Sequence, residues 1–507
     1  MISEYGFLSL LPPLAAIFLA MLTRKTVLSL LAGVYLGALM LAGWNPLQGL
    51  IITVTDLLLP ALIAPMNIAL FVLFIMVGGF VGLLERSGGA YALAEALNNK
   101  VTSARRAQLT AWFASMFIGA WTDASPVIVG PILRSITDRL KVSREKLAYI
   151  IDSTAAPMVV NIPFTSWGAF IVSILTLQVA RLPEAVNPWT IYFGAIPFNF
   201  YSIFALSLVG IIAWSRRDYG PMHTAEKRAR NSGEVLKGKT PEESGEGYQF
   251  ENEVRPTLAN IFLPLAAFFL VLFGFTLISG GFPQRTVLEA IQEAEIIVSV
   301  ILAFMVGGFV SGLLLVLRHM ASAGKVVGYW FNGVKKVIFI IVIVILAFSI
   351  GTLTDLLGTD LYLTGLIDEN VPLFLVPALV FLASALMAFS TGTSWGVFSI
   401  MIPLAFGIGV ALDLSLPLLI AAALSGGIMG DHSSPISDTT IISSVGAGCD
   451  HIDHVNTQIA YAISAALAAV VAFILAGLQL PLPLAWGTGL VIIIIITRVL
   501  GRVSEKG

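Results

Sequence analysis

Charged side chains are scarce in this sequence. Asp, Glu, Lys and Arg make up 11% of its 507 residues, whereas a soluble globular protein carries about 25%. Hydrophobic residues make up 57%, and many apolar runs reach the ~20 residues that a helix needs to cross a ~30 Å hydrocarbon core. The ~10-residue alternation of transmembrane barrels does not occur. The composition therefore predicts an all-α polytopic membrane protein with about 11–13 transmembrane helices.

Cysteine is almost missing as well. Cys449 is the only one, which excludes an intramolecular disulfide and argues against a thiol-based metal cluster. A Walker sequence is also lacking, so ATP-driven pumping has no support. The stretch MISEYGFLSLLPPLAAIFLAML lacks the basic region and cleavage site of a signal peptide, and we expect it to form the first membrane helix. The formal net charge of −2 does not identify a partner, and no nucleic-acid binding is expected.

Basic residues gather in short segments between the apolar runs. Lys and Arg accumulate in cytoplasmic loops, so we assign these segments to the cytoplasmic side of a cytoplasmic (inner) membrane. The most hydrophilic stretch lies in mid-chain and has the composition of a flexible linker. We therefore expect an N-terminal transmembrane half, a cytoplasmic linker, and a C-terminal transmembrane half with a final extra helix, at residues 1–215, 216–256 and 257–507.

The apolar runs also place the helices within these halves. Two stretches, 107–133 and 372–412, fit hairpins or broken helices better than single spans. Single helices are expected near residues 6–22, 26–43, 67–84, 147–180, 192–214, 257–279, 296–317, 336–354, 415–447, 455–478 and 484–499.

Short sequences recur between the two halves in two competing registers. At offsets of 228–232 residues, MVGGFV, IGxxTD and TSWGxF each occur twice. At an offset of 272, Pro131 matches Pro403 and Pro163 matches Pro435, and the loop charges make the two modules point in opposite directions. Inverted repeats around broken helices are a common transporter plan. The topology favours the inverted register, although the first has better residue identity. Both predict two repeated halves with broken helices and hairpins at the centre.

Four aspartates fall within the expected membrane region: Asp123, Asp152, Asp431 and Asp438. A charge at membrane depth costs ~2.5–3.5 kcal/mol on insertion scales, so ionisable groups there are functional candidates by default. No Lys or Arg lies clearly beside these four in the sequence. This favours protonation, a bound small hard cation, or both in alternation.

Helix breaks accompany the aspartates. In GDHSSPISD (430–438), Pro435 lacks an N–H and prevents a regular helix, so the freed backbone groups should line a cavity. Ser437 or Asp438 is expected to cap the next helix. Similar breaks are expected at NIPFTSW (161–167) and STGTSW (390–395). Carboxylates, hydroxyls and free carbonyls are ligands that Na⁺ uses. The candidate cavity residues are Asp152, Asn161, Thr165, Ser166, Trp167, Thr393, Ser394, Trp395, His432, Ser433 and Ser434.

These features also have structural explanations. Neighbouring helices often satisfy a kink rich in Ser, Thr and Pro. Asp123 fits a hairpin tip in the interface, and Asp152, six residues after Lys146, fits a carboxylate that extends to the membrane surface.

Tryptophan and histidine residues near the breaks also have structural explanations. A Trp such as Trp167 or Trp395 is more often an interface anchor than a cavity wall. His432 is more often structural than pH-responsive. The run CDHIDH (449–454) is expected to be a solvated loop rather than a metal site, because its ligand set is not closed.

The motifs together resemble those of the NhaC-type Na⁺/H⁺ antiporter family. The resemblance extends over about residues 67–480 and is carried by GDHSSPISDTTIISS, GCDHIDHVNTQIAYA, GTSWGVFSIMIP and IPFTSWG. It implies a secondary carrier of the cytoplasmic membrane that couples Na⁺ to proton or solute movement, with Asp431, Asp438, Ser437 and Thr439 as site residues. Family members carry ions alone or small organic acids, amino acids and related metabolites, so the resemblance leaves the solute open.

The favoured function is secondary active exchange of Na⁺ for H⁺ by alternating access. Protons and Na⁺ would compete for the carboxylates of Asp438, Asp431 and Asp123, with Asp431 and Asp438 as Na⁺ ligands. Na⁺ and H⁺ are then coupling ions, and no other cofactor is expected. The lipid bilayer is the surrounding partner, and a homodimer is left open.

The alternative is a Na⁺- or H⁺-coupled carrier of a small organic solute, with Phe164, Trp167 and Trp395 as pocket walls. A cationic or zwitterionic solute fits better, because no buried Arg or Lys is available to receive an anion. An intramembrane aspartyl protease is disfavoured because GxGD is missing. A channel or receptor is disfavoured because broken repeats suit a carrier better. Since the protease is disfavoured as well, we expect no enzymatic activity.

Overall fold

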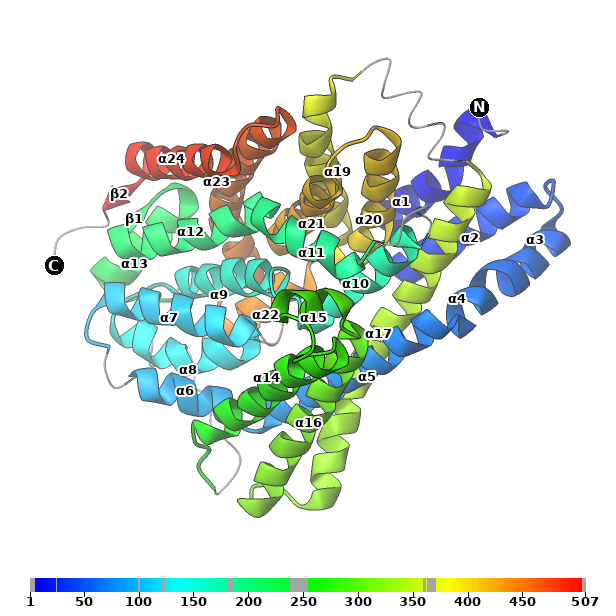
Figure 1. Cartoon of the computed structure of the whole chain (residues 1–507). Helices are drawn as coiled ribbons and strands as arrows, with labels where there is room; N and C mark the ends of the chain where they lie inside the picture. The colour runs from blue at the N-terminus through cyan, green and yellow to red at the C-terminus, as the bar shows by residue number, and fades with distance from the viewer. Residues whose placement is uncertain are drawn as a thin grey trace.

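The computed structural model describes residues 5–23, 25–98, 101–120, 125–180, 182, 186–237, 254–358, 362 and 371–503. Within these ranges the chain is almost entirely helical (Figure 1), and two short strands, β1 (Arg217–Asp218) and β2 (Arg502–Val503), pair antiparallel. Nine of the helices so described are long and apolar enough to cross a membrane, or ten if one bent pair counts as a single span. The protein is thus the all-α polytopic membrane protein that was predicted.

Up to residue 215 the helices are η1 (Gly6–Leu10), α1 (Leu11–Thr23), α2 (Thr26–Leu41), α3 (Pro46–Ile52), η2 (Thr53–Leu58), α4 (Leu59–Ile63), α5 (Pro65–Arg86), α6 (Gly89–Asn98), α7 (Ala104–Gly119), α8 (Ser125–Arg139), α9 (Arg144–Val159), α10 (Ser166–Val179), α11 (Pro188–Ala195), η3 (Ile196–Phe198) and α12 (Phe200–Ser215). After β1 they are α13 (Gly220–Ser232), α14 (Ala259–Ser279), α15 (Val287–Glu293), α16 (Ile296–Leu317), α17 (Ala323–Leu356), η4 (Leu373–Leu375), α19 (Val376–Thr391), α20 (Ser394–Ala411), α21 (Leu416–Ser433), α22 (Asp438–Ala447), α23 (His451–Gly477) and α24 (Leu482–Leu500).

Helix breaks explain why fewer full spans occur than predicted. The helical stretches expected at 147–180 and 415–447 are each divided in two at the predicted breaks, into α9 with α10 and α21 with α22. Pro163 and Pro435 lie in the two gaps, where a residue without an N–H ends the regular helix. The helix expected at 192–214 is also a pair, α11 and α12, bent by 43°. The helical stretch Pro46–Ile63 was not predicted, and its mean hydropathy of 1.7 is lower than that of most other spans.

The repeated MVGGFV sequence marks a close seam between helices. Figure 1 shows α5 and α17 crossing the lower part of the molecule side by side. A Cβ on Gly79 would lie 1.9 Å from the indole nitrogen of Trp330, and one on Gly333 would lie 2.0 Å from the carbonyl oxygen of Gly78. The second copy, in α16, packs on the first, because a Cβ on Gly307 would lie 3.0 Å from the ring of Phe80. Small residues therefore bring these backbones together, as is common in membrane helix pairs.

The start of the predicted flexible linker is ordered and packed. The residues between α12 and position 237 form β1 and α13, and the acidic side chains Asp218 and Glu226 are buried there. Asp218 pairs with the buried Lys146 of α9 and accepts a 2.7 Å hydrogen bond from the Tyr461 hydroxyl. Glu226 accepts hydrogen bonds of 2.8 Å from the backbone N–H and the hydroxyl of Ser143. Buried polar partners, which composition alone does not reveal, hold this segment in place. The rest of the expected linker, 238–253, lies outside the described residues.

Burial raises the pKa of the Glu226 carboxyl in α13. The nearby Asp218 carboxylate acts in the same direction, while Lys146 and Arg230 oppose the shift.

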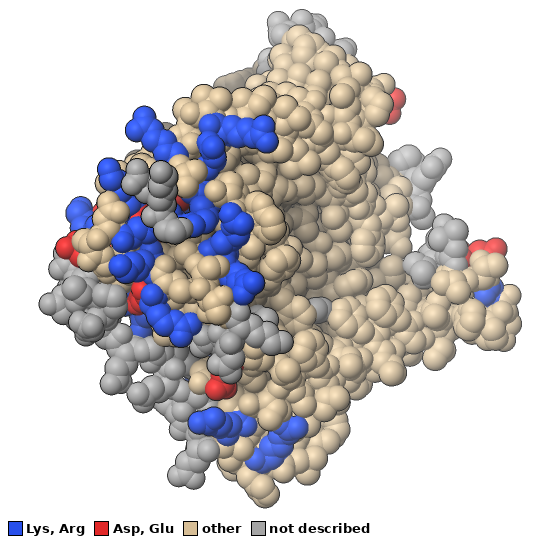
Figure 2. Space-filling model, turned by 90° about the vertical axis from the view of Figure 1, so that its left-hand side faces the viewer, with Lys and Arg blue, Asp and Glu red and all other residues tan. Residues whose placement is uncertain are grey.

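The surface around Asp218 and Glu226 is basic. Figure 2 shows Lys and Arg side chains gathered on this face of the molecule. The exposed basic residues include Arg105, Arg106, Lys227, Arg498 and Arg502.

Candidate ion-binding site

The break between α21 and α22 is held from two sides. The hydroxyl of Ser434 donates to the carbonyl of Phe389 in α19 at 2.7 Å, and the imidazole Nε2 of His451 lies 2.7 Å from the carbonyl oxygen of Pro435. Gly392, between α19 and α20, has a φ of +68°, and a Cβ there would lie 2.7 Å from the carbonyl of Ile436. The two predicted breaks, STGTSW and GDHSSPISD, therefore pack against each other.

Asp431 lies where these breaks meet. It is 1% exposed, and its Oδ2 accepts a 2.6 Å hydrogen bond from the hydroxyl of Ser394 and a 3.2 Å bond from the Ser394 backbone N–H. Its Oδ1 accepts a 2.5 Å bond from the hydroxyl of Ser437, which is itself 2.9 Å from the Thr439 hydroxyl. We call Asp431, Ser394, Ser437 and Thr439 the Asp431 cluster. Because Ser394 is the first residue of α20, the helix dipole also favours a negative charge at this position.

Other predicted residues of this region have different partners. The hydroxyl of Ser433 donates to the carbonyl of Met429 in its own helix. His432 does not bond Asp431, because its Nδ1 lies 3.1 Å from the Ile428 carbonyl and its Nε2 2.9 Å from the Tyr201 hydroxyl. Thr393 is the N-cap residue of α20 without a side-chain capping bond.

Two of the predicted aspartates cannot be placed in the site. Asp123 lies outside the described residues. Asp438 begins α22, but its side chain lies outside the described part of the structure. Their expected roles in binding Na⁺ or H⁺ stay predictions.

The break between α9 and α10 is closed by structural bonds. Thr165 caps α10 by accepting a 3.1 Å hydrogen bond from the Gly168 N–H, directly before the half-buried Ser166. The amide of Asn161 donates to the Pro157 carbonyl at 2.7 Å and accepts from Asn199 at 2.8 Å. Among the predicted cavity residues, Asn161 and Thr165 thus stabilise the break itself.

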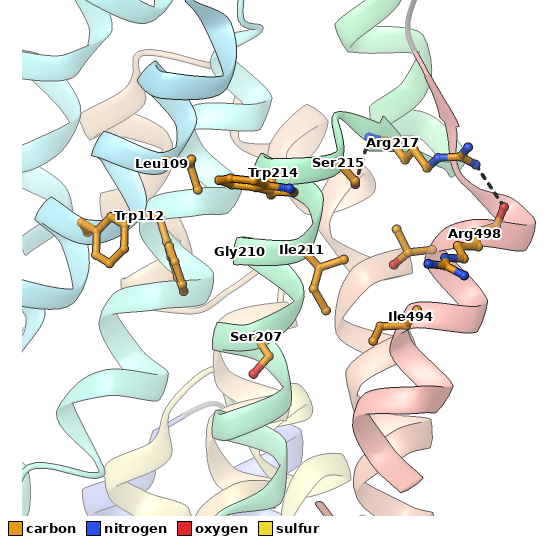
Figure 3. Close-up of a pocket in the computed structure, with 12 residues that line it drawn as sticks. Leu109, Trp112, Ser207, Gly210, Ile211, Trp214, Ser215, Arg217, Ile494 and Arg498 are labelled. Carbon is orange, nitrogen blue, oxygen red and sulfur yellow. Dashed lines mark hydrogen bonds between the residues drawn. The ribbon is translucent and has the colours of Figure 1, made fainter. Parts of the chain in front are cut away.

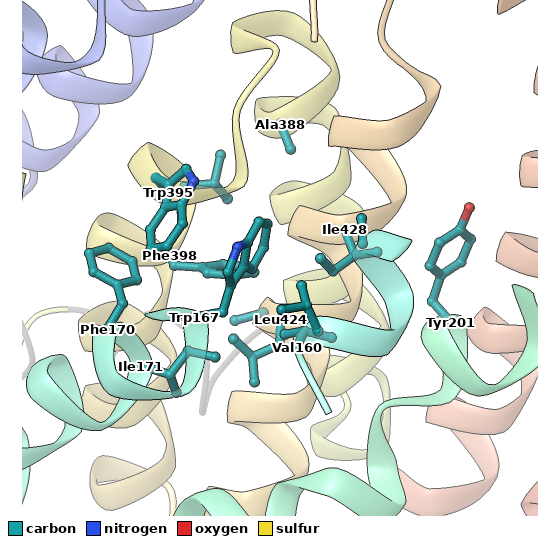
Figure 4. Close-up of a cluster of buried hydrophobic side chains, with 14 of the residues drawn as sticks. Val160, Trp167, Phe170, Ile171, Tyr201, Ala388, Trp395, Phe398, Leu424 and Ile428 are labelled. Carbon is teal, nitrogen blue, oxygen red and sulfur yellow. The ribbon is translucent and has the colours of Figure 1, made fainter. Parts of the chain in front are cut away.

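The two TSWG sequences meet through their aromatic rings. The ring centroids of Trp167 and Trp395 are 4.8 Å apart (Figure 4). Trp167 also contacts Phe398 at 5.9 Å, and Trp395 contacts Phe170 at 4.9 Å, both edge-on. Such reciprocal contacts are what two equivalent segments related by a local two-fold axis produce. They support the register with an offset of 228 residues, whereas the inverted arrangement stays a prediction.

The aromatic pair is not an interface anchor. Trp167 is 1% exposed and Trp395 8%, so the expectation that each lies at the membrane surface is wrong. They are buried because each ring packs against the other copy of the same motif, a contact that no single Trp reveals. Within the described ranges, the indole N–H of Trp167 has no hydrogen-bond partner.

A second buried polar cluster surrounds Asp152. Its Oδ2 lies 3.2 Å from Nε2 of His454 and accepts a 2.8 Å hydrogen bond from Nε2 of Gln458. Its Oδ1 accepts a 3.1 Å bond from the hydroxyl of Ser443. We call these four residues the Asp152 cluster. Asp152 is 1% exposed, so it does not reach the membrane surface as the structural explanation supposed, and the nearby Lys146 pairs with Asp218 instead.

The CDHIDH run is not the solvated loop that was predicted. Asp450 caps α23 by accepting from the N–H groups of Ile452 and Asp453, and His454 is fully buried. Within the described ranges, no group of three or more His, Cys, Asp and Glu residues is arranged to hold a metal. His454 was missed because the helix was expected to begin only at residue 455, which left Gln458 without a partner on the same helix face. Extending it to residue 451 would have placed them one turn apart on one face.

A groove of about 1030 Å³ lies between α7, α12 and α24. Figure 3 shows Leu109, Trp112, Trp214 and Ile494 along its walls, with Arg217 and Arg498 at one end. None of its lining residues belongs to the Asp431 or Asp152 cluster. The candidate site is therefore the buried polar interior and not this groove.

Comparisons with known proteins place these features in a wider context. The sequence model of a family described as the Na⁺/H⁺ antiporter family matches residues 158–478. An uncharacterized protein of Haemophilus influenzae is 36% identical over 485 residues, which cover 92% of this chain and 90% of that protein. A malate-2H⁺/Na⁺-lactate antiporter of Bacillus subtilis is 36% identical over 118 residues, 22% of this chain and 25% of that protein.

A solved structure is also similar in fold. The YdaH transporter of Alcanivorax borkumensis superposes with a TM-score of 0.57 at 17% sequence identity, covering 86% of this chain and 90% of that one. The family match includes the Asp431 cluster, all three described helix breaks and, of the Asp152 cluster, Ser443, His454 and Gln458, whereas Asp152 itself lies just before the matched residues.

Proposed function

The chain belongs to the Na⁺/H⁺ antiporter family, and from that premise we propose that it exchanges Na⁺ for H⁺ across the cytoplasmic membrane at the carboxylate of Asp431. It is a multi-pass membrane carrier and not an enzyme. The observation that carries the proposal is the burial of Asp431 at the meeting point of two helix breaks, with hydroxyl groups on both of its oxygens.

The hydroxyls allow the site to hold either ion. A hydroxyl is both a donor and an acceptor, so Ser437 can donate to an ionised Asp431 or turn a lone pair towards a cation. Na⁺ would take oxygen ligands from the carboxylate of Asp431 and the hydroxyls of Ser437 and Thr439. A proton on Asp431 removes the negative charge that holds Na⁺. The two ions therefore exclude each other, and each can be released only when the other arrives.

Alternating access would follow from movement at the breaks. The segments between α19 and α20 and between α21 and α22 both contribute to the Asp431 cluster, so a shift of one broken helix against the other changes the side from which Asp431 is reached. The asymmetry needed for net exchange comes from the ion gradients.

The test uses purified protein in liposomes that contain a pH-sensitive dye, with a pH gradient imposed. NaCl, KCl and LiCl are added in turn to wild type, Asp431→Asn and Asp438→Asn. The matched control is Asp413→Asn, an exposed position with a φ of 51° that asparagine tolerates. We expect Na⁺ to move protons in wild type and in the control but not in Asp431→Asn. Wild-type exchange in Asp431→Asn would remove this residue from the mechanism.

A second candidate function is coupled transport of a small organic solute. It is favoured by the unpartnered indole N–H of Trp167 beside Trp395, which could donate to an acceptor on a solute. The related Bacillus protein is named for malate and lactate, so organic acids are among the solutes to be tried. Thermal stabilisation of the protein across a panel of metabolites tests this, with Trp167→Phe, which removes the donor, as the comparison. A panel without any stabilising compound would count against this candidate.

A further inference from the structure

The Asp152 cluster contains an acid and a base in direct contact. Asp152 on α9 and His454 on α23 are both buried, and Nε2 of the imidazole is 3.2 Å from Oδ2 of the carboxylate. A carboxylate only accepts hydrogen bonds, so Nε2 carries the hydrogen. In a neutral imidazole the other nitrogen, Nδ1, then holds a lone pair. That nitrogen is buried and has no hydrogen-bond partner in the part of the chain that the structure describes.

An unused acceptor lies on the same helix face. Gln458, one turn after His454, donates from Nε2 to Asp152 and to the carbonyl of His432. Its Oε1 is buried and has no partner among the described residues. A buried nitrogen with a lone pair and a buried acceptor without a donor are both unfavourable unless a proton or a ligand satisfies them. Both atoms belong to residues one turn apart on α23, so the unfilled positions lie in the same cluster.

The Asp152 cluster is also connected to the Asp431 cluster. The His432 carbonyl that accepts from Gln458 also accepts a 3.2 Å bond from the hydroxyl of Thr440, and it belongs to the residue directly after Asp431. Gln458 therefore touches both the carboxylate of Asp152 and the backbone that carries Asp431. A change in charge at Asp152 alters the bond that fixes this backbone.

We propose that Asp152 and His454 form a second proton-binding site, separate from the cation site at Asp431 and linked to it through Gln458. A proton from water on one side binds at Nδ1 of His454, giving an imidazolium paired with the Asp152 carboxylate, and leaves to water on the other side. The linkage to Na⁺ rests on the proposed exchange function, whereas proton binding by the pair does not.

Further titratable groups face the pair from neighbouring helices. His432 on α21 and Tyr201 on α12 also face Asp152, and they are hydrogen-bonded to each other at 2.9 Å. Two turns earlier on α9, Lys146 is engaged by Asp218. Asp152 and His454 are thus an acid and a base in direct contact in this region, and one of them has an unfilled proton position.

The experiment is infrared difference spectroscopy of the full chain in lipid nanodiscs between about pH 8 and pH 5, the range in which imidazoles titrate. The buffer first contains choline in place of Na⁺. The variants are Asp152→Asn and His454→Gln, the latter retaining an amide donor for Asp152. The matched controls are Asp413→Asn and the exposed His319→Gln. Size-exclusion profiles and thermal unfolding establish that each variant is folded.

The chain has five histidines, so we expect one component of the imidazole protonation signal, present in wild type and in both controls, to be lost in Asp152→Asn and in His454→Gln. Folded Asp152→Asn and His454→Gln proteins that retain the wild-type signal would overturn the proposal and make the pair an inert ion pair.

The linkage is tested in the same preparations by adding NaCl. Na⁺ is expected to weaken proton binding by the pair roughly 5- to 150-fold, the usual range for coupled sites. Gln458→Leu removes a donor to Asp152, so the proton signal itself is expected to change, but its response to NaCl should be lost. Asp431→Asn, which lies outside the Asp152 cluster, should lose the same response. A Na⁺ shift that persists in Gln458→Leu would overturn the link through Gln458.

The two proposals can fail separately. If liposomes show no Na⁺-driven proton movement while the infrared signal is still lost in the pair variants, the exchange function is wrong and the proton site stands. If exchange is observed and the infrared signal is the same in wild type, Asp152→Asn and His454→Gln, the proposed proton site is wrong.

Discussion

Ser394 donates twice to Asp431, from its hydroxyl at 2.6 Å and from its backbone N–H at 3.2 Å. The two residues are 37 positions apart and belong to different broken helices. The contact joins the start of α20 to the end of α21 and stabilises the ionised form of the carboxylate. A hydrogen bond of this kind, to a charged group, contributes about 1.5–3 kcal/mol.

Ser394→Ala should therefore weaken Na⁺ binding. Without the hydroxyl donor, the ionised carboxylate is less stable and protons compete better, so the KM for Na⁺ is expected to rise roughly 10- to 150-fold. The rise should be larger at lower pH. Transport in liposomes at two pH values measures it. The control is Ser399→Ala, whose buried hydroxyl bonds only the Gly396 carbonyl of the same helix at 2.7 Å. An equal effect of both substitutions would contradict the assignment.

Gly79→Ala should destabilise the α5–α17 seam. The new Cβ would lie 1.9 Å from the indole nitrogen of Trp330, and forcing these helices apart is expected to cost about 1–3 kcal/mol. Thermal unfolding in detergent measures the loss. Gly274→Ala in α14 is the matched control, because its Cβ meets nothing within 4 Å. If Gly79→Ala were as stable as Gly274→Ala, the close approach of α5 and α17 would be wrong.

Lys146→Met should destabilise the junction of α9 with β1, which precedes α13. Lys146 and Asp218 are 0% and 1% exposed, and removing one partner of a buried pair leaves an uncompensated charge that costs about 3–5 kcal/mol. The double variant Lys146→Met with Asp218→Asn should recover most of this loss. Lys336→Met serves as the control, because that lysine is 59% exposed in its pair with Glu85 and such pairs contribute about 0–1 kcal/mol. Unfolding titrations give the comparison, and a double variant no better than Lys146→Met would argue against a direct pair.

Trp167→Ala should cost about 3–5 kcal/mol of unfolding free energy, because it removes a buried ring that packs on both Trp395 and Phe398. Trp167→Phe should cost much less, since it keeps an aromatic contact. Trp214→Ala is the control, a tryptophan that is 64% exposed. Similar losses in Trp167→Ala and Trp214→Ala would mean that the reciprocal packing of the two motifs contributes little.

Much of the fold followed from local properties of the chain. Long apolar runs predict membrane helices because a helix must satisfy its own backbone in lipid, and α14, α16 and α24 begin and end within two residues of the predicted bounds. The breaks at Pro163 and Pro435 were predictable because proline ends a helix wherever it occurs. Asp431 could be chosen because an acid in an apolar run is conspicuous by itself.

Other features depended on contacts between distant segments. His454 is 302 residues from Asp152, and neither residue predicts the other. The order of α13 depends on buried partners in α9 and α23, so its hydrophilic sequence pointed wrongly to a flexible linker.

Hydropathy, proline and charge act within a few residues of the chain, so they predict a multi-pass helical membrane protein with acids and helix breaks inside the membrane. Which side chains meet at those acids depends on contacts between distant helices. The partners Ser394, His454 and Gln458 are set by how the helices pack and turn against one another. A side-chain hydrogen bond needs its two atoms within about 3 Å, a condition that spacing along the chain does not fix.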